Sequence, residues 1–181
     1  MNTMIPAWVE GTLTPVEKLE VHKKGLRHKA VSIFVMRGDR ILLQQRALSK
    51  YHTPGLWANT CCTHPYWDEQ PLTCAERRLE EELGIPGLPL TFRERVEYRA
   101  VVGNGLIEHE VADIFVGNAG PELEPVANPA EVMDTAWMSL TDLLAEIQRD
   151  PTIYTPWLKI YLSDHSAKIF GDVQPMPERR L

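Results

Sequence analysis

An apolar, strand-like segment followed at once by a turn and a second such segment constrains the fold of this chain most strongly. Residues 30–36 are rich in β-branched and aromatic side chains, and residues 41–45 resume the same pattern. The four residues between them contain a Gly-Asp pair, which is typical of a turn. We therefore predict a β-hairpin here.

Residues 73–83 are predicted to form a helix. Thr73 and Glu76 match a capping box at its start. Two leucines lie on one face of the helix, and Gly84 follows as a stop signal.

Further strands and helices follow this helix. Strand patterns at residues 95–102 and 107–116 flank a Gly-Asn-Gly turn. Helical patterns cover residues 139–148, which open with Ser-x-x-Asp, and residues 156–169, where proline is tolerated in the first turn. This order of elements predicts an α/β (α+β) fold, in which helices flank a mixed β-sheet.

Length, charge and cysteine content limit the class of protein. The 181 residues fit a single domain, 1–181, and residues 171–181 are expected to form a mobile or surface tail. The net charge of −6 argues against non-specific nucleic-acid binding, although local cations can still bind an anionic ligand. No apolar run is long enough to span a membrane. No signal peptide is visible, so the three cysteines are expected to be reduced thiols in a cytoplasmic protein.

Residues 59–65 are predicted to form a loop with two adjacent cysteines and a histidine. Vicinal cysteines do not easily form a disulfide with each other. The Cys-x-His pair of Cys62 and His64 is suited to binding a metal or placing a nucleophile. A loop with small buried thiols is the alternative.

Two carboxylates begin a strand whose same face is otherwise apolar. Because side chains alternate along a strand, Glu108 and Glu110 share the face that continues with Ala112 and Ile114. Buried carboxylates need charged partners, and a divalent metal would supply the charge. An edge strand with both acids in water is the alternative. These acids can act together with three histidines, His22, His28 and His64. Such a set of side chains would suit a first-row divalent metal in octahedral geometry.

The helix at residues 73–83 belongs to a longer charge pattern. The stretch Thr63-x5-Glu69-x7-Arg77-Arg78-Leu79-Glu80-Glu81-Glu82-Leu83-Gly84-Ile85 resembles the Nudix box, Gly-x5-Glu-x7-Arg-Glu-apolar-x-Glu-Glu-x-Gly-apolar. In Nudix hydrolases this helix binds magnesium on a diphosphate. Here Thr63 stands in place of the first glycine and Arg78 in place of a metal-binding glutamate, which argues against a hydrolase. A salt-bridged surface helix, with Arg78 and Glu82 paired, is the alternative.

Five separated motifs together resemble the type I isopentenyl-diphosphate isomerases, a Nudix-fold family with the same altered box. The motifs are residues 46–50, 54–57, 59–65, the altered box and Glu108-x-Glu110. The resemblance covers roughly residues 18–157. It implies a Nudix-like isomerase core at about residues 18–165.

The resemblance also implies roles for individual residues. An inner divalent metal, manganese, magnesium or zinc, would be bound by His22, His28, His64, Glu108 and Glu110. A second magnesium would arrive with the diphosphate and lie near Glu82 and the backbone carbonyl of Cys62. The cations that grip the diphosphate match Lys18, Arg46, Lys50 and Arg78. The catalytic residues match Cys62, Glu110, Tyr98 and Trp157.

The implied reaction interconverts isopentenyl diphosphate and dimethylallyl diphosphate in isoprenoid biosynthesis. The alkene is protonated to a tertiary carbocation, which then loses a different proton. Cys62 and Glu110 would form the acid–base pair, with Tyr98 as a relay. Trp157 would place a π face over the cation. The sequence leaves open which of the pair protonates the alkene, the native inner metal, the pathway served and whether the protein is a monomer or a homodimer. No role is assigned to Cys61.

Two other functions remain as alternatives. A Nudix pyrophosphohydrolase would act on a nucleoside diphosphate derivative, and it would need neither the cysteine nor the cation at Arg78. A non-catalytic metal-bound module would explain the histidines and glutamates, but not the joint presence of Cys62, Tyr98 and Trp157. The expected partner is thus a small-molecule prenyl diphosphate rather than a nucleic acid or a membrane.

Overall fold

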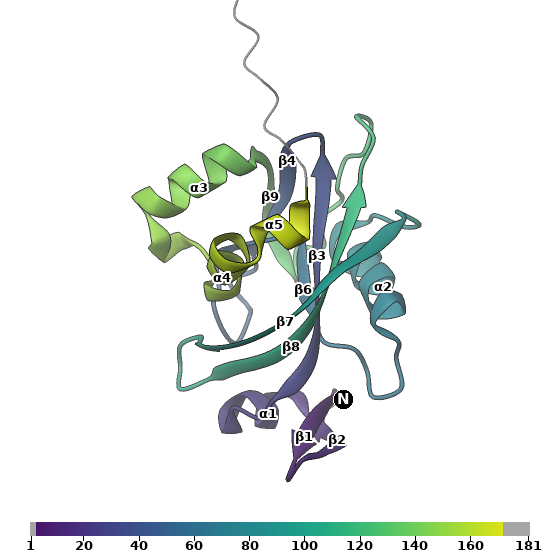
Figure 1. Ribbon diagram of the computed structural model, residues 1–181, viewed down its shortest axis with the longest axis vertical. Coiled ribbons are helices and arrows are strands. Elements are labelled where there is room, and N and C mark those ends of the chain that lie inside the picture. The colour runs from purple at the N-terminus through teal and green to yellow at the C-terminus, as the bar shows by residue number, and fades with distance from the viewer. Residues whose placement is uncertain (1–2, 172–181) are drawn as a thin grey trace, which may run out of the picture.

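The computed structural model describes residues 3–171 and contains a mixed β-sheet with helices on both sides (Figure 1). Its strands are β1 (Met4–Val9), β2 (Thr12–Glu17), β3 (His28–Arg37), β4 (Arg40–Arg46), β5 (Trp57–Ala58), β6 (Cys61–Thr63), β7 (Leu90–Val101), β8 (Ile107–Asn118) and β9 (Val132–Ser139). Its helices are α1 (Lys18–Lys24), α2 (Pro71–Leu83), α3 (Leu140–Arg149), the short 3₁₀ helix η1 (Pro151–Ile153), α4 (Pro156–Asp164) and α5 (Ser166–Phe170). The predicted tail lies outside the described residues from position 172 onward.

Strand β3 lies at the centre of the sheet. It pairs with β4 only beside the predicted turn, at Met36 with Ile41 and Arg37 with Arg40. Beyond the turn β4 departs to pair with β5 and β9, while β3 pairs antiparallel with β6 and parallel with β8. The predicted hairpin and the mixed sheet are therefore confirmed, and β3 is left with β6 on one side and β8 on the other.

The two faces of β3 belong to two different cores. Ala30, Phe34 and Met36 pack in a cluster that includes residues of α4 and α5. Val31 and Ile33 lie in a second cluster that includes the buried residues of α2. Figure 1 accordingly shows α2 on one side of β3 and α4 with α5 on the other. The alternation along a strand thus separates the side chains of neighbouring residues into different environments.

Helix α2 confirms the predicted helix but not its predicted start. It begins at Pro71, and the residue before it, Gln70, makes no side-chain capping bond. The predicted capping box of Thr73 and Glu76 is therefore wrong, because proline, with its fixed φ, occupies the first turn. The predicted stop is confirmed: Gly84 has a φ of 61°, and its N–H bonds to the last carbonyls of the helix.

The C-terminal segment contains two helices where the sequence predicted one. Helix α3 begins as expected, with the Ser139 side chain accepting a hydrogen bond from the N–H of Asp142. The predicted helix at residues 156–169 is broken at His165, which has φ −127° and ψ 1°. Nδ1 of His165 lies 3.1 Å from a carboxylate oxygen of Glu94 on β7, a contact that local periodicity does not reveal. Among the described residues, no helix is long and apolar enough to cross a membrane.

Candidate active site

Four separate elements bring the five predicted metal ligands together. The parallel register of β3 and β8 places His28 opposite Glu110. Helix α1 is followed by its capping residue Gly25, where an added Cβ would lie 3.2 Å from the side chain of Ile107, so α1 ends close to the start of β8. We call the resulting group the imidazole–carboxylate cluster; it consists of His22, His28, His64, Glu108 and Glu110, and all five side chains are buried.

Ligand atoms of four members of this cluster, His22, His28, His64 and Glu108, lie within 4.8 Å of one another, and Glu110 adjoins them at His64. Oε2 of Glu108 lies 3.1 Å from Nε2 of His22 and 3.3 Å from Nε2 of His28. Nε2 of His64 lies 3.2 Å from both Nε2 of His28 and Oε1 of Glu110. Donor atoms around a six-coordinate ion with bonds of about 2.0–2.2 Å lie about 3–4 Å apart. The spacing of the cluster matches that geometry.

The protonation of the histidines also suits a cation. Nδ1 of His22 lies 2.6 Å from the carbonyl of Lys18, and Nδ1 of His28 lies 2.7 Å from the carbonyl of Leu26. A carbonyl only accepts, so Nδ1 of each ring carries a proton and donates it, and Nε2 is the nitrogen that faces the cluster. Nε2 of His22 and Oε2 of Glu108 are buried without a hydrogen-bond partner. Such orphaned acceptors fit a divalent metal ion.

The two oxygens of Glu110 have different surroundings. Oε1 faces the histidines, while Oε2 accepts a 2.7 Å hydrogen bond from the hydroxyl of Tyr98, its register partner on β7. Burial, and then the negative charge of Glu108, raises the pKa of the Glu110 carboxyl well above its usual range. Glu110 can therefore hold a proton near the cluster, with a hydroxyl in contact with it.

Cys62 lies across β3 from Glu110. Its thiol donates to Oδ1 of Asn59 over 2.9 Å and lies 3.0 Å from the hydroxyl of Ser32, its register partner on β3. Burial raises the pKa of the Cys62 thiol, so the sulfur carries its proton at neutral pH. Cys61, one residue earlier, is completely buried in the core beside α2. The two adjacent thiols thus lie on opposite faces of the sheet.

A cavity of about 40 Å³ connects these groups. Cys62, Glu108 and Glu110 contribute to its wall, and so does Trp157 from the first turn of α4. Residues 51 and 52 also line it, as do Thr63 and His64. The hydroxyl of Tyr98 reaches this site through Glu110. The structure therefore brings together all four residues predicted to be catalytic.

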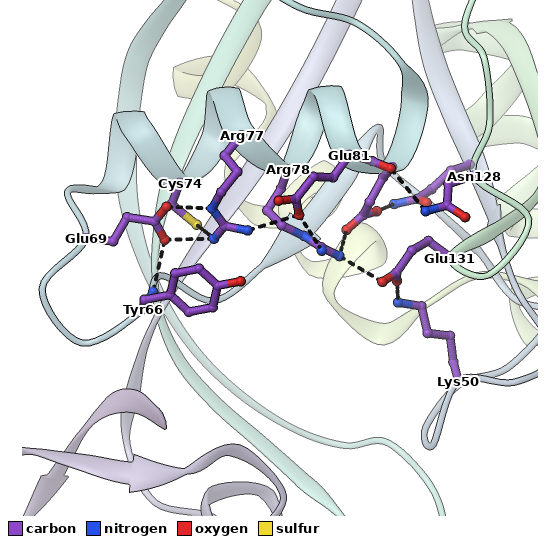
Figure 2. A network of polar contacts seen from close by, with 11 residues as sticks. Lys50, Tyr66, Glu69, Cys74, Arg77, Arg78, Glu81, Asn128 and Glu131 are labelled. Carbon is purple, nitrogen blue, oxygen red and sulfur yellow. Dashed lines mark hydrogen bonds and ion pairs between the residues drawn. The ribbon is translucent and has the colours of Figure 1, made fainter. Parts of the chain in front are cut away.

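The four predicted diphosphate-binding cations, Lys18, Arg46, Lys50 and Arg78, line the same cavity, and we call them the cation cluster. Most of these cations already have partners. The guanidinium of Arg46 donates to the carbonyls of His52 and Thr53, each over 3.2 Å. Figure 2 shows Arg78 between Glu81 and Glu131, and the Lys50 ammonium on Glu131. Burial lowers the pKa of Lys50 to about 8.

Glu82, predicted to lie near a second magnesium, is buried behind the cation cluster. One of its oxygens pairs with Arg78, and the other accepts from Nε2 of Gln44 over 3.2 Å. Among the described residues, Glu82 is not one of those that line this cavity. The predicted role of Glu82, like that of the Cys62 carbonyl, stays a prediction.

Sequence reasoning missed three charged or titratable residues of this site: Tyr51, His52 and Glu131. His52 contacts Glu108, with Nε2 of His52 3.0 Å from Oε1 of Glu108. Glu131 pairs with both Lys50 and Arg78 (Figure 2). His52 stands two residues after a predicted diphosphate-binding lysine, which was an available signal. Glu131 has no such signal, because its partners are 53 and 81 positions away in the chain.

Comparison with known proteins first defines the class. Residues 26–158 match the family model of the NUDIX domain. Among solved structures, DR0079 from Deinococcus radiodurans has a TM-score of 0.69 at 12% identity, covering 87% of this chain and 96% of that one. A MutT Nudix hydrolase from Burkholderia pseudomallei has a TM-score of 0.59 at 27% identity, covering 75% and 95%. The sheet and helices described above are therefore a Nudix fold.

Curated relatives then define the particular family. The isopentenyl-diphosphate Delta-isomerase of Dinoroseobacter shibae is 61% identical over 173 residues, which are 96% of this chain and 98% of the relative. The enzymes of the same name from Roseobacter denitrificans and Rhodobacter capsulatus are 62% and 61% identical, and each alignment covers at least 94% of this chain and 97% of the relative. The chain belongs to the isopentenyl-diphosphate Delta-isomerase family.

Proposed function

We propose that this protein interconverts isopentenyl diphosphate and dimethylallyl diphosphate, supplying the two isomers to isoprenoid biosynthesis. The observation that carries the proposal is the placement of Cys62 and Glu110 on the two strands that flank β3, with both lining one cavity. A double-bond shift needs one group that delivers a proton and a second that removes another. Membership of the isomerase family supports the same reaction.

The chemistry requires protection of a cation. A proton added to the terminal CH₂ of the alkene leaves a tertiary carbocation at the neighbouring carbon. Loss of a different proton from the next CH₂ group then gives the product, so atoms and charge balance without an oxidant or reductant. Water would trap the cation, and the largely buried walls contributed by Trp157, Glu110 and Cys62 keep water away.

Cys62 and Glu110 are the acid–base pair in this proposal. The raised pKa values of both groups favour proton-carrying forms in the free protein. Tyr98 holds one oxygen of Glu110 through its hydroxyl and can relay a proton there. Asn59 and Ser32 orient the thiol of Cys62. Either member of the pair can act first, because the reaction is reversible.

The imidazole–carboxylate cluster is proposed to hold a divalent metal, namely manganese, magnesium or zinc. Bound there, the ion would supply positive charge that stabilises the ionised carboxylates of the cluster. Burial lowers the pKa of His64 well below its usual value, so the imidazole is neutral and suited to ligation. Trp157 contributes its π face to the carbocation formed during the reaction, an interaction worth about 2 kcal/mol or more in a desolvated site.

The cation cluster is proposed to bind the diphosphate, with magnesium near Glu82. The diphosphate does not react, but its binding energy can hold the small prenyl group between Cys62 and Glu110. Arg78 is part of this cluster at the position where a Nudix hydrolase carries a glutamate. That substitution supports isomerisation over hydrolysis.

The purified protein with isopentenyl diphosphate and magnesium tests the proposal. We expect dimethylallyl diphosphate as product, and in heavy water we expect deuterium in both the product and the recovered substrate. Nucleoside diphosphate derivatives under the same conditions should release no phosphate or pyrophosphate. Pyrophosphohydrolysis without isomerisation would favour the hydrolase alternative. No turnover by metal-loaded protein would favour a binding module.

A further inference from the structure

His52 is a fourth buried histidine beside the imidazole–carboxylate cluster, and the proposed reaction gives it no role. It lies in residues 47–56, the segment between β4 and β5, and its side chain is only 6% exposed. Nε2 of His52 lies 3.0 Å from Oε1 of Glu108. A buried polar contact of this kind, at a carboxylate proposed to bind metal, needs a physical account.

The two oxygens of Glu108 face different partners. Oε2 faces the histidines of the cluster, at 3.1 Å from Nε2 of His22 and 3.3 Å from Nε2 of His28. Oε1 faces His52. His52 therefore contacts the oxygen of Glu108 other than the one that lies nearest to His22 and His28.

The direction of the hydrogen bonds follows from the chemistry of the partners. A carboxylate only accepts, so Nε2 of His52 carries the proton and donates to Glu108. Nδ1 of His52 lies 3.1 Å from the hydroxyl of Thr53, which then donates to it. A neutral imidazole completes this chain from hydroxyl to ring to carboxylate. The ring is thus held at both nitrogens.

The backbone around His52 is held in an unfavourable conformation. Thr53 is β-branched, yet it has a φ of 45°, in the left-handed region that such residues rarely adopt. Arg46 holds this conformation by donating to the carbonyls of both His52 and Thr53, each over 3.2 Å. Strain that is maintained by neighbouring contacts is common where a side chain must be aimed at a functional group.

We propose that His52 is a positioning residue, which holds Glu108 with one oxygen turned toward the metal by donating a hydrogen bond to the other oxygen. The inference rests on the proposed metal site of the imidazole–carboxylate cluster. Hydrogen bonds of this kind orient ligands and raise metal affinity, and their loss typically costs about 10–100-fold in affinity. His52 also lies in the same segment as Lys50, so it connects the metal ligand Glu108 to the cation cluster.

The test measures the affinity of metal-stripped protein for Mn²⁺ alone, by competition with a chelator and without substrate. We expect His52→Ala to weaken Mn²⁺ binding by about 10–100-fold. His52→Gln should restore most of the affinity, because its side-chain amide can donate to Glu108 from a similar position. A His52→Ala variant that binds Mn²⁺ as tightly as the wild type would overturn the role of His52. Equal weakening in both variants would also overturn it, since the hydrogen bond would then not be the cause.

Two further variants keep the test decisive. His109→Ala is the matched control, because His109 stands between the two glutamates but contacts Glu97 on the outer face of the sheet; its Mn²⁺ affinity should be unchanged. Thr53→Val keeps the shape and removes the hydroxyl, and it should weaken Mn²⁺ binding severalfold. If His52→Ala fails to fold, wild-type affinity in Thr53→Val would refute the proposed chain.

A kinetic measurement separates positioning from general damage. The Mn²⁺ concentration that half-activates His52→Ala should rise by the same factor as its dissociation constant, while KM for isopentenyl diphosphate at saturating Mn²⁺ stays within about twofold of the wild type. Activity that saturating Mn²⁺ does not restore would contradict the inference. Wild-type protein that binds no Mn²⁺ would instead refute the proposed metal site itself, so the two failures are distinguishable.

Discussion

The imidazole–carboxylate cluster and the cation cluster differ in how their charges are satisfied. In the first, Nε2 of His22 and Oε2 of Glu108 lie 3.1 Å apart, and both are buried without a hydrogen-bond partner. In the second, Lys50 and Arg78 already pair with Glu131 (Figure 2). The first region needs a cation to complete its electrostatics, as expected for a resident ion. In the second, two of the four cations are already paired, so a diphosphate that binds Lys50 and Arg78 must exchange with Glu131, as expected for a substrate that binds and leaves.

The largest effect should come from the thiol between these two regions. Cys62→Ala is expected to lower kcat by about 10²–10⁴-fold, the usual contribution of a positioned acid or base. Cys61→Ala is the matched control and should retain most activity, because Cys61 lies in the core on the opposite face. The measurement is the initial rate with isopentenyl diphosphate. If both variants are equally active or equally inactive, the assignment of the thiol fails.

Removal of a negative charge from the imidazole–carboxylate cluster should lower the amount of metal that the purified protein retains. Glu108→Gln keeps the shape of the side chain but loses a converging anionic oxygen, so activity should fall by more than the roughly 100-fold cost of losing an outer hydrogen bond. Elemental analysis should find a stoichiometric divalent metal in the wild type and less in the variant. Glu97→Gln, a change at an exposed carboxylate paired with Arg27, should leave both quantities unchanged. Full wild-type activity in chelator would contradict the prediction.

Reversal of one charge in the cation cluster should act on substrate binding. Arg78→Glu restores the Nudix consensus and places an anion where the diphosphate is proposed to bind. Loss of a charge-assisted contact costs about 1.5–3 kcal/mol, and reversal should cost more, so kcat/KM should fall by more than about tenfold. Steady-state kinetics measure this effect. Unchanged kinetics would mean that Arg78 is only a surface salt-bridge partner of Glu81 and Glu82.

A smaller effect of opposite sign would test whether Glu131 competes with the diphosphate. Glu131→Gln frees Lys50 and Arg78 from a partly exposed ion pair worth about 0.2–1 kcal/mol, so KM should fall by about 1.4- to fivefold. Glu124→Gln, which removes an exposed carboxylate paired with Arg37, should not change KM. A rise in KM for Glu131→Gln would mean that Glu131 orients the cations instead of competing for them.

The pH dependence of KM should show the smallest effect. Burial lowers the pKa of Lys50 to about 8, against the opposing field of Glu82. Below that pKa the amine is charged and can bind a diphosphate; above it the charge is lost, so KM should rise with pH. At pH 8 about half of the lysine is neutral, which corresponds to about a twofold rise. Lys50→Arg should flatten the rise between pH 7 and 9, and an equally steep profile in that variant would exclude Lys50 as its source.

Local sequence signals predicted much of this site because the responsible physics is local. Alternation along β8 predicted that Glu108 and Glu110 share a face with Ala112 and Ile114, and all four are buried. Alternation along β6 likewise turns Cys61 and Cys62 to opposite faces of the sheet, where the sequence predicted a loop. The charge pattern of α2 predicted the pair of Arg78 and Glu82.

Other features could not be predicted, because they depend on contacts between distant segments. The start of α2 was misplaced by two residues, since Pro71 initiates the helix although Thr73 and Glu76 match a capping box. The break at His165 arises beside Glu94, which is 71 residues away in the chain. Short-range periodicity carries no information about such contacts.

The sequence by itself determined the strand pairs at the two turns, the helix stop at Gly84, the altered Nudix box and the residue types available for chemistry. Turn geometry, side-chain alternation and composition decide these features within a few residues. Only the tertiary structure decided that His28 lies opposite Glu110, that His52 contacts the second oxygen of Glu108 and that Glu131 pairs with Lys50 and Arg78. Each of these contacts depends on strand register and loop packing over dozens of residues, because a shift of one position turns a side chain to the other face.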